Sequence, residues 1–146
     1  MAATPTPHPP QLVPIELFDH KTTSDAEMDS AIRAGLSTSV LKQLQTSWNL
    51  TVLELSAALA IPRSTLMQMM RSPKKMTPAD SDRVYRFAQV LALTERYIGD
   101  RTRALGWLRH PNTVLGSVTP FHALETEIGR QRVIQTLGVI AYGGVS

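Results

Sequence analysis

The side chains best placed to recognise another molecule lie between residues 52 and 71, on the second of two short helical segments. Arg63 and Gln68 carry groups that form paired hydrogen bonds with a base edge, arginine with guanine and glutamine with adenine. Ser64 and Thr65 lie at the start of this segment, where hydroxyl and backbone N–H groups suit phosphate oxygens. Further cations suited to backbone phosphates follow: Arg71, Lys74 and Lys75. These residue types predict recognition of DNA.

The residues that would position this face follow the pattern of two short helices packed across a tight turn. Such a unit needs inward apolar residues on both helices, a small residue where the helices cross and another in the turn. The sequence meets every requirement: Leu55, Ser56, Leu59, Ala60, Ile61, Leu66 and Met69. The turn often holds glycine, and a left-handed alanine costs about 1 kcal/mol, so we expect a slightly different turn. A helical hairpin that reads no base fits the same pattern.

The charge distribution favours a polyanionic partner for the middle of the chain. The 146 residues carry 15 basic and 12 acidic side chains, a net charge of +3. Residues 63–109 hold ten of the basic and four of the acidic side chains, a net charge of +6, whereas residues 1–62 carry −3. Contacts with phosphates release condensed counterions from DNA, and a basic segment benefits from this release. A solvated helical surface accounts for the same charges equally well.

Helical periodicity and helix caps organise the chain from about residue 24 onward. The candidate N-caps are Ser24, Thr51, Ser64, Thr77, Asp100, Thr119 and Thr126. Apolar stripes of helical spacing run through residues 35–49, 84–91 and 128–141, and Gly143-Gly144 ends the last of them. No alternating strand pattern and no internal repeat rise above this periodicity. We therefore predict an all-α chain of about six to eight helices.

Residues that could catalyse a reaction or bind a metal are not arranged to do so. The sequence has no cysteine, which excludes disulfides, thiolate metal sites and cysteine nucleophiles. The histidines show no pairing at metal-binding helical spacing: His8, His20, His110 and His122. We expect no enzyme activity, no cofactor and no metal. The lack of cysteine fits a cytoplasmic location, and the longest apolar run, six residues at 57–62, is too short to cross a membrane.

From residue 104 to residue 143 the chain carries short marks whose order and spacing are specific together. They are Trp107-Leu108, Pro111-Asn112, Leu115-Gly116, Thr119-Pro120, Leu124, Thr126, Gly129, Val133, Leu137 and Tyr142-Gly143. Upstream, residues 81–86 read S-D-R-V-Y-R. Over residues 33–143, roughly three quarters of the chain, the sequence resembles the Xre/MbcA/ParS family of antitoxins.

This resemblance implies the antitoxin of a type II toxin–antitoxin system. It implies a Cro/repressor-like helix-turn-helix followed by a small helical domain that binds a RES-domain toxin, an enzyme that consumes NAD⁺. It also implies a homodimer that blocks the toxin's active-site cleft and represses its own operon through operator DNA. We accordingly predict a helix-turn-helix domain at 31–98 and a toxin-binding domain at 99–146. Residues 1–30 are not part of the shared pattern, and their many prolines predict a flexible N-terminal arm.

Candidate toxin contacts come from aromatic residues and from the chain end. Trp107 and Tyr142 have side chains of the kind that anchors interfaces, although Trp107 suits an ordinary core position at least as well. The short, apolar-tipped end can reach into a neighbouring cleft. The full set of predicted toxin contacts is Trp107, Leu108, Arg109, Tyr142, Gly143, Gly144, Val145 and Ser146. Gly129 and Gly138 cost helix stability, which indicates a close backbone approach from this chain or from a partner.

Two alternatives to an antitoxin stay open at this point. A stand-alone helix-turn-helix transcriptional regulator would use its C-terminal domain only to dimerise, matching two operator half-sites about one helical turn apart. A scaffold or polar-localisation protein would carry a degenerate helix-turn-helix that ignores DNA. Capture of a toxin separates the antitoxin from both alternatives.

Overall fold

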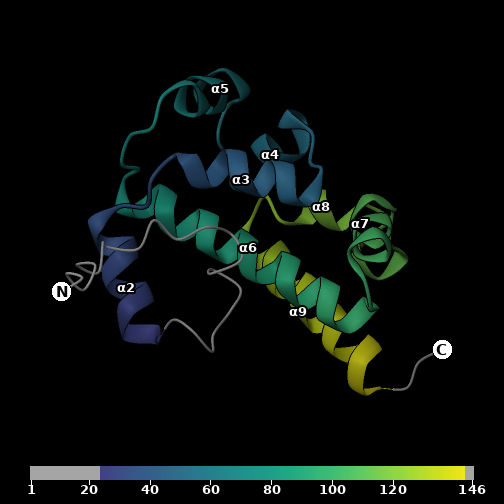
Figure 1. The fold of residues 1–146 in the computed structure, drawn as a ribbon. Helices are drawn as coiled ribbons and strands as arrows, with labels where there is room; N and C mark the ends of the chain where they lie inside the picture. Colours follow the sequence, from purple (N-terminus) through teal and green to yellow (C-terminus); the bar gives the residue numbers. More distant parts are fainter. Residues whose placement is uncertain (1–23, 144–146) are drawn as a thin grey trace.

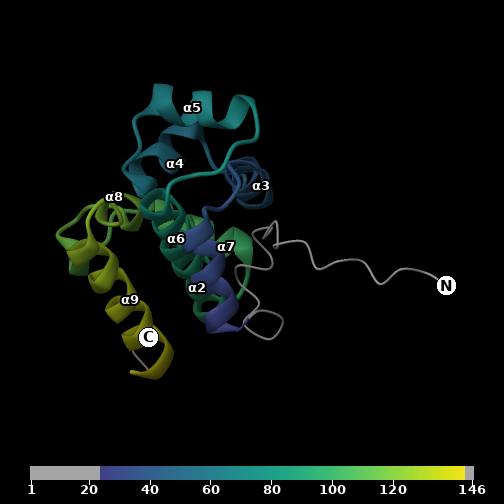
Figure 2. The ribbon, with the colours of Figure 1, turned by 90° about the vertical axis from the view of Figure 1, so that its left-hand side faces the viewer.

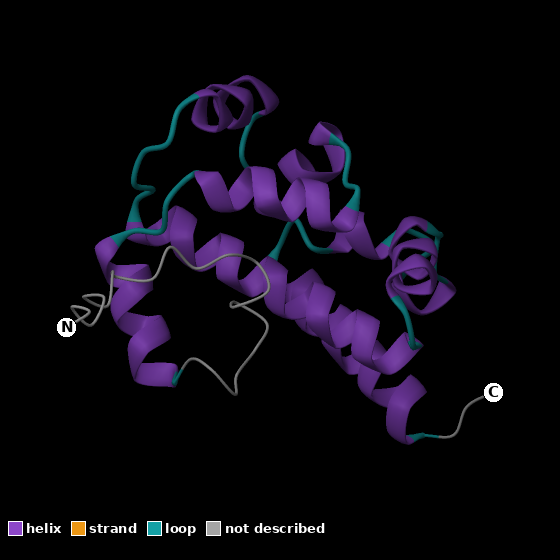
Figure 3. Ribbon diagram, in the orientation of Figure 1, coloured by secondary structure: helices purple, strands orange, loops and turns teal. Residues whose placement is uncertain are grey.

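A computed structural model describes residues 24–143, and every regular element in this part of the chain is a helix (Figure 3). None of these helices is long and apolar enough to cross a membrane. The elements are α2 (Asp25–Ala34), α3 (Ser39–Trp48), α4 (Val52–Leu59), α5 (Arg63–Arg71), α6 (Pro78–Ile98), α7 (Arg101–Arg109), the 3₁₀ helix η1 (Thr113–Leu115), α8 (Pro120–Ala123) and α9 (Glu127–Tyr142). The all-α fold class is confirmed. Most of the predicted arm at residues 1–30 lies outside the described residues, and its last part is already helical because α2 begins at Asp25.

Side-chain caps set the starts of most helices. Six of the predicted N-caps are confirmed, because each accepts a hydrogen bond from the backbone N–H three residues further on: Ser24, Thr51, Thr77, Asp100, Thr119 and Thr126. Thr51 also forms a complete capping box with Glu54. The prediction of a cap at Ser64 is wrong, because α5 already starts at Arg63 and its N-cap is Pro62, which has no side-chain oxygen.

The helix predicted to run from residue 35 to 49 begins later, at Ser39. Gly35 ends α2 with a φ of 93°, a conformation that side chains other than glycine rarely adopt. The next residues pair with the loop that follows α5, since Met76 N–H donates to the Leu36 carbonyl over 2.8 Å. A Cβ atom at Gly35 would overlap the carbonyl oxygen of Met76. Glycine is therefore required here by both backbone conformation and space.

Helix α6 is the central helix of the molecule and packs against α2, α4, α7 and α9. Figure 1 shows α6 running diagonally across the view, with α3 and α4 above it and α9 alongside its second half. Its buried side chains include Val84, Phe87 and Leu91, as the apolar stripe at residues 84–91 predicts. They belong to one apolar core that also contains Leu66 of α5 and Leu137 of α9. The two predicted domains therefore share a core.

The two helical glycines of α9 differ in their surroundings. A Cβ atom at Gly129 would overlap the carbonyl oxygen of Ala123, the last residue of α8. At Gly138 no atom outside the helix's own backbone lies within 4 Å of such a Cβ. The predicted close approach is thus confirmed at Gly129, whereas at Gly138 no described residue of this chain makes it.

This difference predicts opposite effects of two matched substitutions. Gly129→Ala forces the α8–α9 turn apart and should lower the free energy of unfolding by about 1 to 3 kcal/mol. Gly138→Ala adds a methyl group in open space and should raise it by up to about 1 kcal/mol, because alanine is the better helix former. Urea denaturation of the two variants measures both effects. Equal shifts of the same sign would contradict the packing at Gly129.

Candidate DNA-binding and partner-binding surfaces

The helix-turn-helix is formed by α4, α5 and the tight turn between them. Ala60 ends α4 in the left-handed conformation, with φ 54° and ψ 39°, so the expected departure from this turn geometry is absent. Two hydrogen bonds between Ser56 and Ile61 close the turn. Ile61 N–H donates to the Ser56 carbonyl over 3.1 Å, and the Ser56 hydroxyl donates to the Ile61 carbonyl. Leu66 is buried beneath α5 and Met69 is half-buried. The predicted small and apolar positions thus serve the packing assigned to them.

The outer face of α5 presents the predicted base-reading and phosphate-binding side chains. Figures 1 and 2 both show α5 along one outer edge of the molecule. The predicted DNA contacts are all exposed: Arg63, Ser64, Thr65, Gln68, Arg71, Lys74 and Lys75. Within residues 24–143 none of the four cations among them pairs with a carboxylate. The structure therefore gathers four unneutralised positive charges on one helix and the loop that follows it.

The loop that carries the two lysines is held against the start of α3. Thr38 N–H donates to the Lys74 carbonyl over 2.7 Å, and Lys74 N–H donates to the Thr38 hydroxyl over 2.9 Å. An isolated antiparallel bridge joins Ser37 to Lys75. These bonds fix the backbone from which both lysines project. The role of Thr38 could not be predicted from the sequence, because the pairing joins residues 36 positions apart.

The predicted toxin contacts fall into different environments. Leu108 is fully buried in the shared core and Trp107 is half-buried against it. Tyr142 and Gly143 are exposed, Tyr142 to 79%. The remaining predicted contacts, Gly144, Val145 and Ser146, lie outside the described residues. Leu108 consequently has no surface to offer a partner in the monomer.

Arg109 ties α7 to the N-terminal half. Its Nε donates to Glu54 Oε2 over 2.7 Å and its Nη2 donates to the carbonyl of Asn49 over 2.9 Å. Partial burial raises the pKa of Glu54, but hydrogen bonds from Arg109 and from Thr51 N–H outweigh burial and hold that pKa below its usual value. Because Glu54 also completes the capping box of α4, this ion pair locks α7 onto the first helix of the helix-turn-helix.

The end of α9 is attached to the end of α6 by two tyrosines. The rings of Tyr97 and Tyr142 meet edge to face, with centroids 5.9 Å apart and an interplanar angle of 71°. Their hydroxyl oxygens are 3.4 Å apart, and this hydrogen bond raises the pKa of Tyr97. The Tyr142 side chain thus packs against Tyr97 and attaches the end of α9 to α6, while most of its surface faces solvent.

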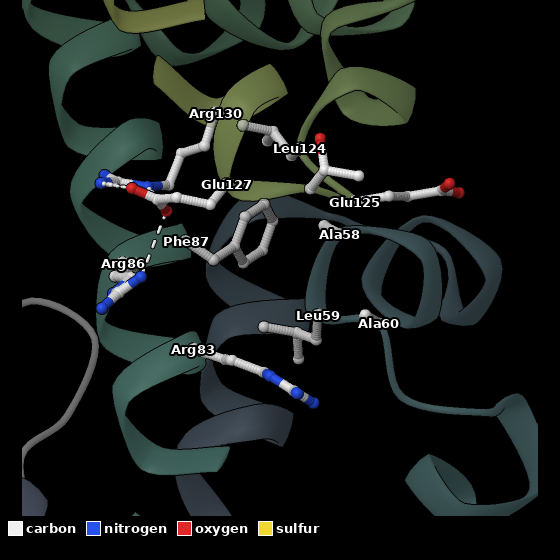
Figure 4. Close-up of a pocket in the computed structure, with 11 residues that line it drawn as sticks. Ala58, Leu59, Ala60, Arg83, Arg86, Phe87, Leu124, Glu125, Glu127 and Arg130 are labelled. Carbon is white, nitrogen blue, oxygen red and sulfur yellow. Dashed lines mark hydrogen bonds and ion pairs between the residues drawn. The ribbon is translucent and has the colours of Figure 1, made fainter. Parts of the chain in front are cut away.

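A hollow of about 250 Å³ lies where α4, α6 and the α8–α9 turn meet, with Phe87 among its lining residues (Figure 4). Arg86 and Arg130 converge on Glu127, while Arg83 points away from it. Glu127 accepts hydrogen bonds from Arg86 Nη1 over 3.1 Å and from Arg130 Nε over 2.8 Å. The bonds from Arg130, ahead of those from Gln131 and the charge of Arg86, lower the pKa of Glu127 to about 2. This carboxylate, which no sequence pattern singled out, joins α6 to α9.

The lowered pKa predicts how acid acts on the fold. The folded-state pKa of Glu127 is about 2 against a usual value near 4.5, so its ionised form stabilises the fold above that usual value. The contribution is lost as the pH falls from about 4.5 towards 2. Glu127→Gln should therefore be less stable than the wild type at pH 6, and the difference should vanish near pH 2. Urea titrations across this range measure it.

The exposed neighbour Glu125 provides the control for this titration. Glu125→Gln removes one carboxylate from the same turn without touching the contacts between α6 and α9. We expect it to follow the wild-type pH profile. A Glu127→Gln variant that also follows it would show that the ion pairs do not stabilise the fold.

Comparison with known proteins assigns a family to both halves of the chain. Residues 27–89 match the antitoxin Xre-like helix-turn-helix domain, and residues 92–143 match the antitoxin Xre/MbcA/ParS C-terminal toxin-binding domain. The curated protein "Antitoxin Xre" from Yersinia enterocolitica is 29% identical over 114 residues, which cover 77% of each chain. The "Antitoxin Xre" from Pseudomonas putida is 31% identical over 120 residues, or 82% of this chain and 74% of that protein.

The two matched segments follow each other along the chain, and the boundary between them lies within α6. The exposed face of α5 falls in the first match, and α7, η1, α8 and α9 fall in the second. The chain therefore belongs to the Xre-type antitoxins, proteins of toxin–antitoxin systems that combine a helix-turn-helix DNA-binding domain with a C-terminal toxin-binding domain.

Proposed function

We propose that this antitoxin neutralises a RES-domain toxin that degrades NAD⁺, and that it represses its own operon as a homodimer in the cytoplasm. The observation that carries the proposal is the match of residues 92–143 to the toxin-binding domain of the Xre/MbcA/ParS family. The antitoxin acts by binding: its C-terminal half binds the toxin and keeps NAD⁺ out of the toxin's active site. The helix-turn-helix half brings the complex to the operator.

Within the C-terminal half, we propose that Trp107, Tyr142 and the chain end from Gly143 to Ser146 contact the toxin. Trp107 keeps part of its ring exposed, and Tyr142 projects from the end of α9 next to that chain end. Leu108 and Arg109 act indirectly, since the first anchors α7 in the core and the second holds α7 on α4. Aromatic side chains at such exposed positions are typical anchors of protein interfaces.

Coexpression with a RES-domain toxin tests the neutralisation. The toxin alone should stop growth and deplete cellular NAD⁺, and the full-length antitoxin should restore both and copurify with the toxin. A chain that lacks residues 142–146 should protect less. Full protection by the truncated chain would contradict the proposed role of the chain end, and failure of the full-length chain to bind would contradict the choice of a RES-domain toxin.

For operator binding, we propose that α5 enters the major groove with Arg63 and Gln68 on base edges. Ser64 and Thr65 bind a phosphate near the N-terminus of α5, where backbone N–H groups are free to donate. The remaining cations fix the register of the helix on the DNA backbone: Arg71, Lys74 and Lys75. The exposure and free charge of this face support the assignment.

Two substitutions separate base reading from phosphate binding. Arg63→Ala should weaken binding to operator DNA by about 1 to 3 kcal/mol with little effect on scrambled DNA. Lys74→Ala should weaken binding to both DNAs alike and reduce the salt dependence by about one phosphate contact. Fluorescence anisotropy at several salt concentrations measures both effects. Arg103→Ala is the control and should bind as the wild type does, because Arg103 is a 75% exposed arginine on α7, in the C-terminal half of the chain.

Equal losses on both DNAs for both variants would contradict base reading by Arg63. A chain that binds no DNA at any salt concentration would contradict autorepression and would favour a scaffold role for the N-terminal half.

A further inference from the structure

The outward side of α9 carries large apolar side chains that are mostly exposed to solvent. Ile128 is 74% exposed, Val139 54% and Tyr142 79%. Their spacing, with Arg132 and Gln135 between them, places all five side chains within about 80° around the helix axis. Figure 2 shows α9 at the edge of the molecule, with α6 on its inner side. We call these five residues the α9 stripe: Ile128, Arg132, Gln135, Val139 and Tyr142.

A shallow groove widens the α9 stripe on the side of η1. It has a volume of about 380 Å³, and its lining includes Val114, Ile140 and Val139. Arg132 Nη2 donates to the carbonyl of Val114 over 2.8 Å, and the Asn112 side chain accepts from Val114 N–H over 2.9 Å. The first bond holds η1 beside α9 and the second caps η1, so the groove is already formed in the isolated chain.

Exposure of this kind is concentrated on one surface. Six large apolar side chains are exposed among residues 24–143, and four of them lie on the α9 stripe or in the groove beside it: Val114, Ile128, Val139 and Tyr142. All four fall within residues 92–143, the part matched by the toxin-binding domain. Val114 and Val139 line the same groove, and exposed apolar side chains gathered around a groove mark an interaction site.

A second copy of this chain is a poor occupant of the α9 stripe. Antiparallel self-pairing would place Arg132 against Val139 of the other copy, and parallel pairing would place Arg132 against itself. The stripe has no acidic side chain to neutralise either arrangement. Burying a cation that faces no carboxylate is unfavourable, so the charge pattern favours a different protein that brings its own carboxylate.

We propose that the α9 stripe and the groove beside η1 form the main docking surface for the toxin. The toxin would place apolar side chains over Val114 and Val139 and a carboxylate opposite Arg132. This inference rests on the proposed function and specifies its surface. It moves the centre of the interface from the predicted α7 residues to α9, with Tyr142 at one end.

Arginine substitutions at exposed positions test this surface without disturbing the core. Val139→Arg should weaken binding of the RES-domain protein by at least about 30-fold, the effect expected for a central interface residue. Ile128→Arg, at the end of the stripe opposite Tyr142, should weaken it by a smaller factor. Leu53→Arg is the matched control, because Leu53 is an apolar side chain of α4 with 62% exposure, outside the toxin-binding half. It should bind the toxin as the wild type does. Calorimetric titration measures affinity, and thermal denaturation checks that all three variants fold.

The possible outcomes separate this inference from the proposed function. Wild-type binding together with unchanged affinity of Val139→Arg and Ile128→Arg would overturn the docking surface and leave the toxin assignment intact. A Val139→Arg chain that changes from dimer to monomer in sedimentation, with toxin affinity unchanged, would show that a second copy covers the stripe. A wild-type chain that captures no RES-domain protein would overturn the proposed function, and this inference with it.

Discussion

The burial of α6 along its whole length constrains the rest of the structure. Helix α6 has 21 residues, and its buried side chains run from Ser81 near its start to Thr94 near its end. Neither half of the chain covers such a helix alone. Helices α2 and α4 pack against it from the N-terminal half, and α7 and α9 from the C-terminal half. DNA recognition and toxin recognition are therefore built on one core, although the two family matches divide the chain at residues 89–92.

Arginine side chains hold the two halves in register around α6. Arg101 stacks over the ring of Trp48 at 4.4 Å and donates to the Ser47 carbonyl over 2.9 Å. Arg109 and Arg86 form the corresponding links to α4 and to α9. The basic side chains that give residues 63–109 a net charge of +6 thus have two roles. These three arginines are engaged within the molecule, whereas the cations on and after α5 stay unneutralised and available to phosphates.

Features that depend on neighbours along the chain could be predicted from the sequence. A cap such as Thr77 acts on the residue three positions later, and the turn at Ala60 depends on contacts within five residues. Contacts between distant segments could not be predicted. Nothing local shows that Met76 pairs with Leu36, and helical periodicity includes Ile128 in the apolar stripe of the last helix although its side chain is 74% exposed. That helix has apolar residues on two sides, and periodicity cannot tell which side meets the core.

The arrangement of the two proposed surfaces constrains how toxin and DNA act on each other. Figures 1 and 2 place α5 and α9 at opposite ends of the molecule, with α4 and α6 between them. The two proposed surfaces therefore share no residue within one chain, and a toxin on α9 would reach α5 only by extending across α4 and α6. Inside the chain the shared core connects them, and the contacts of Glu127 with Arg86 belong to that connection.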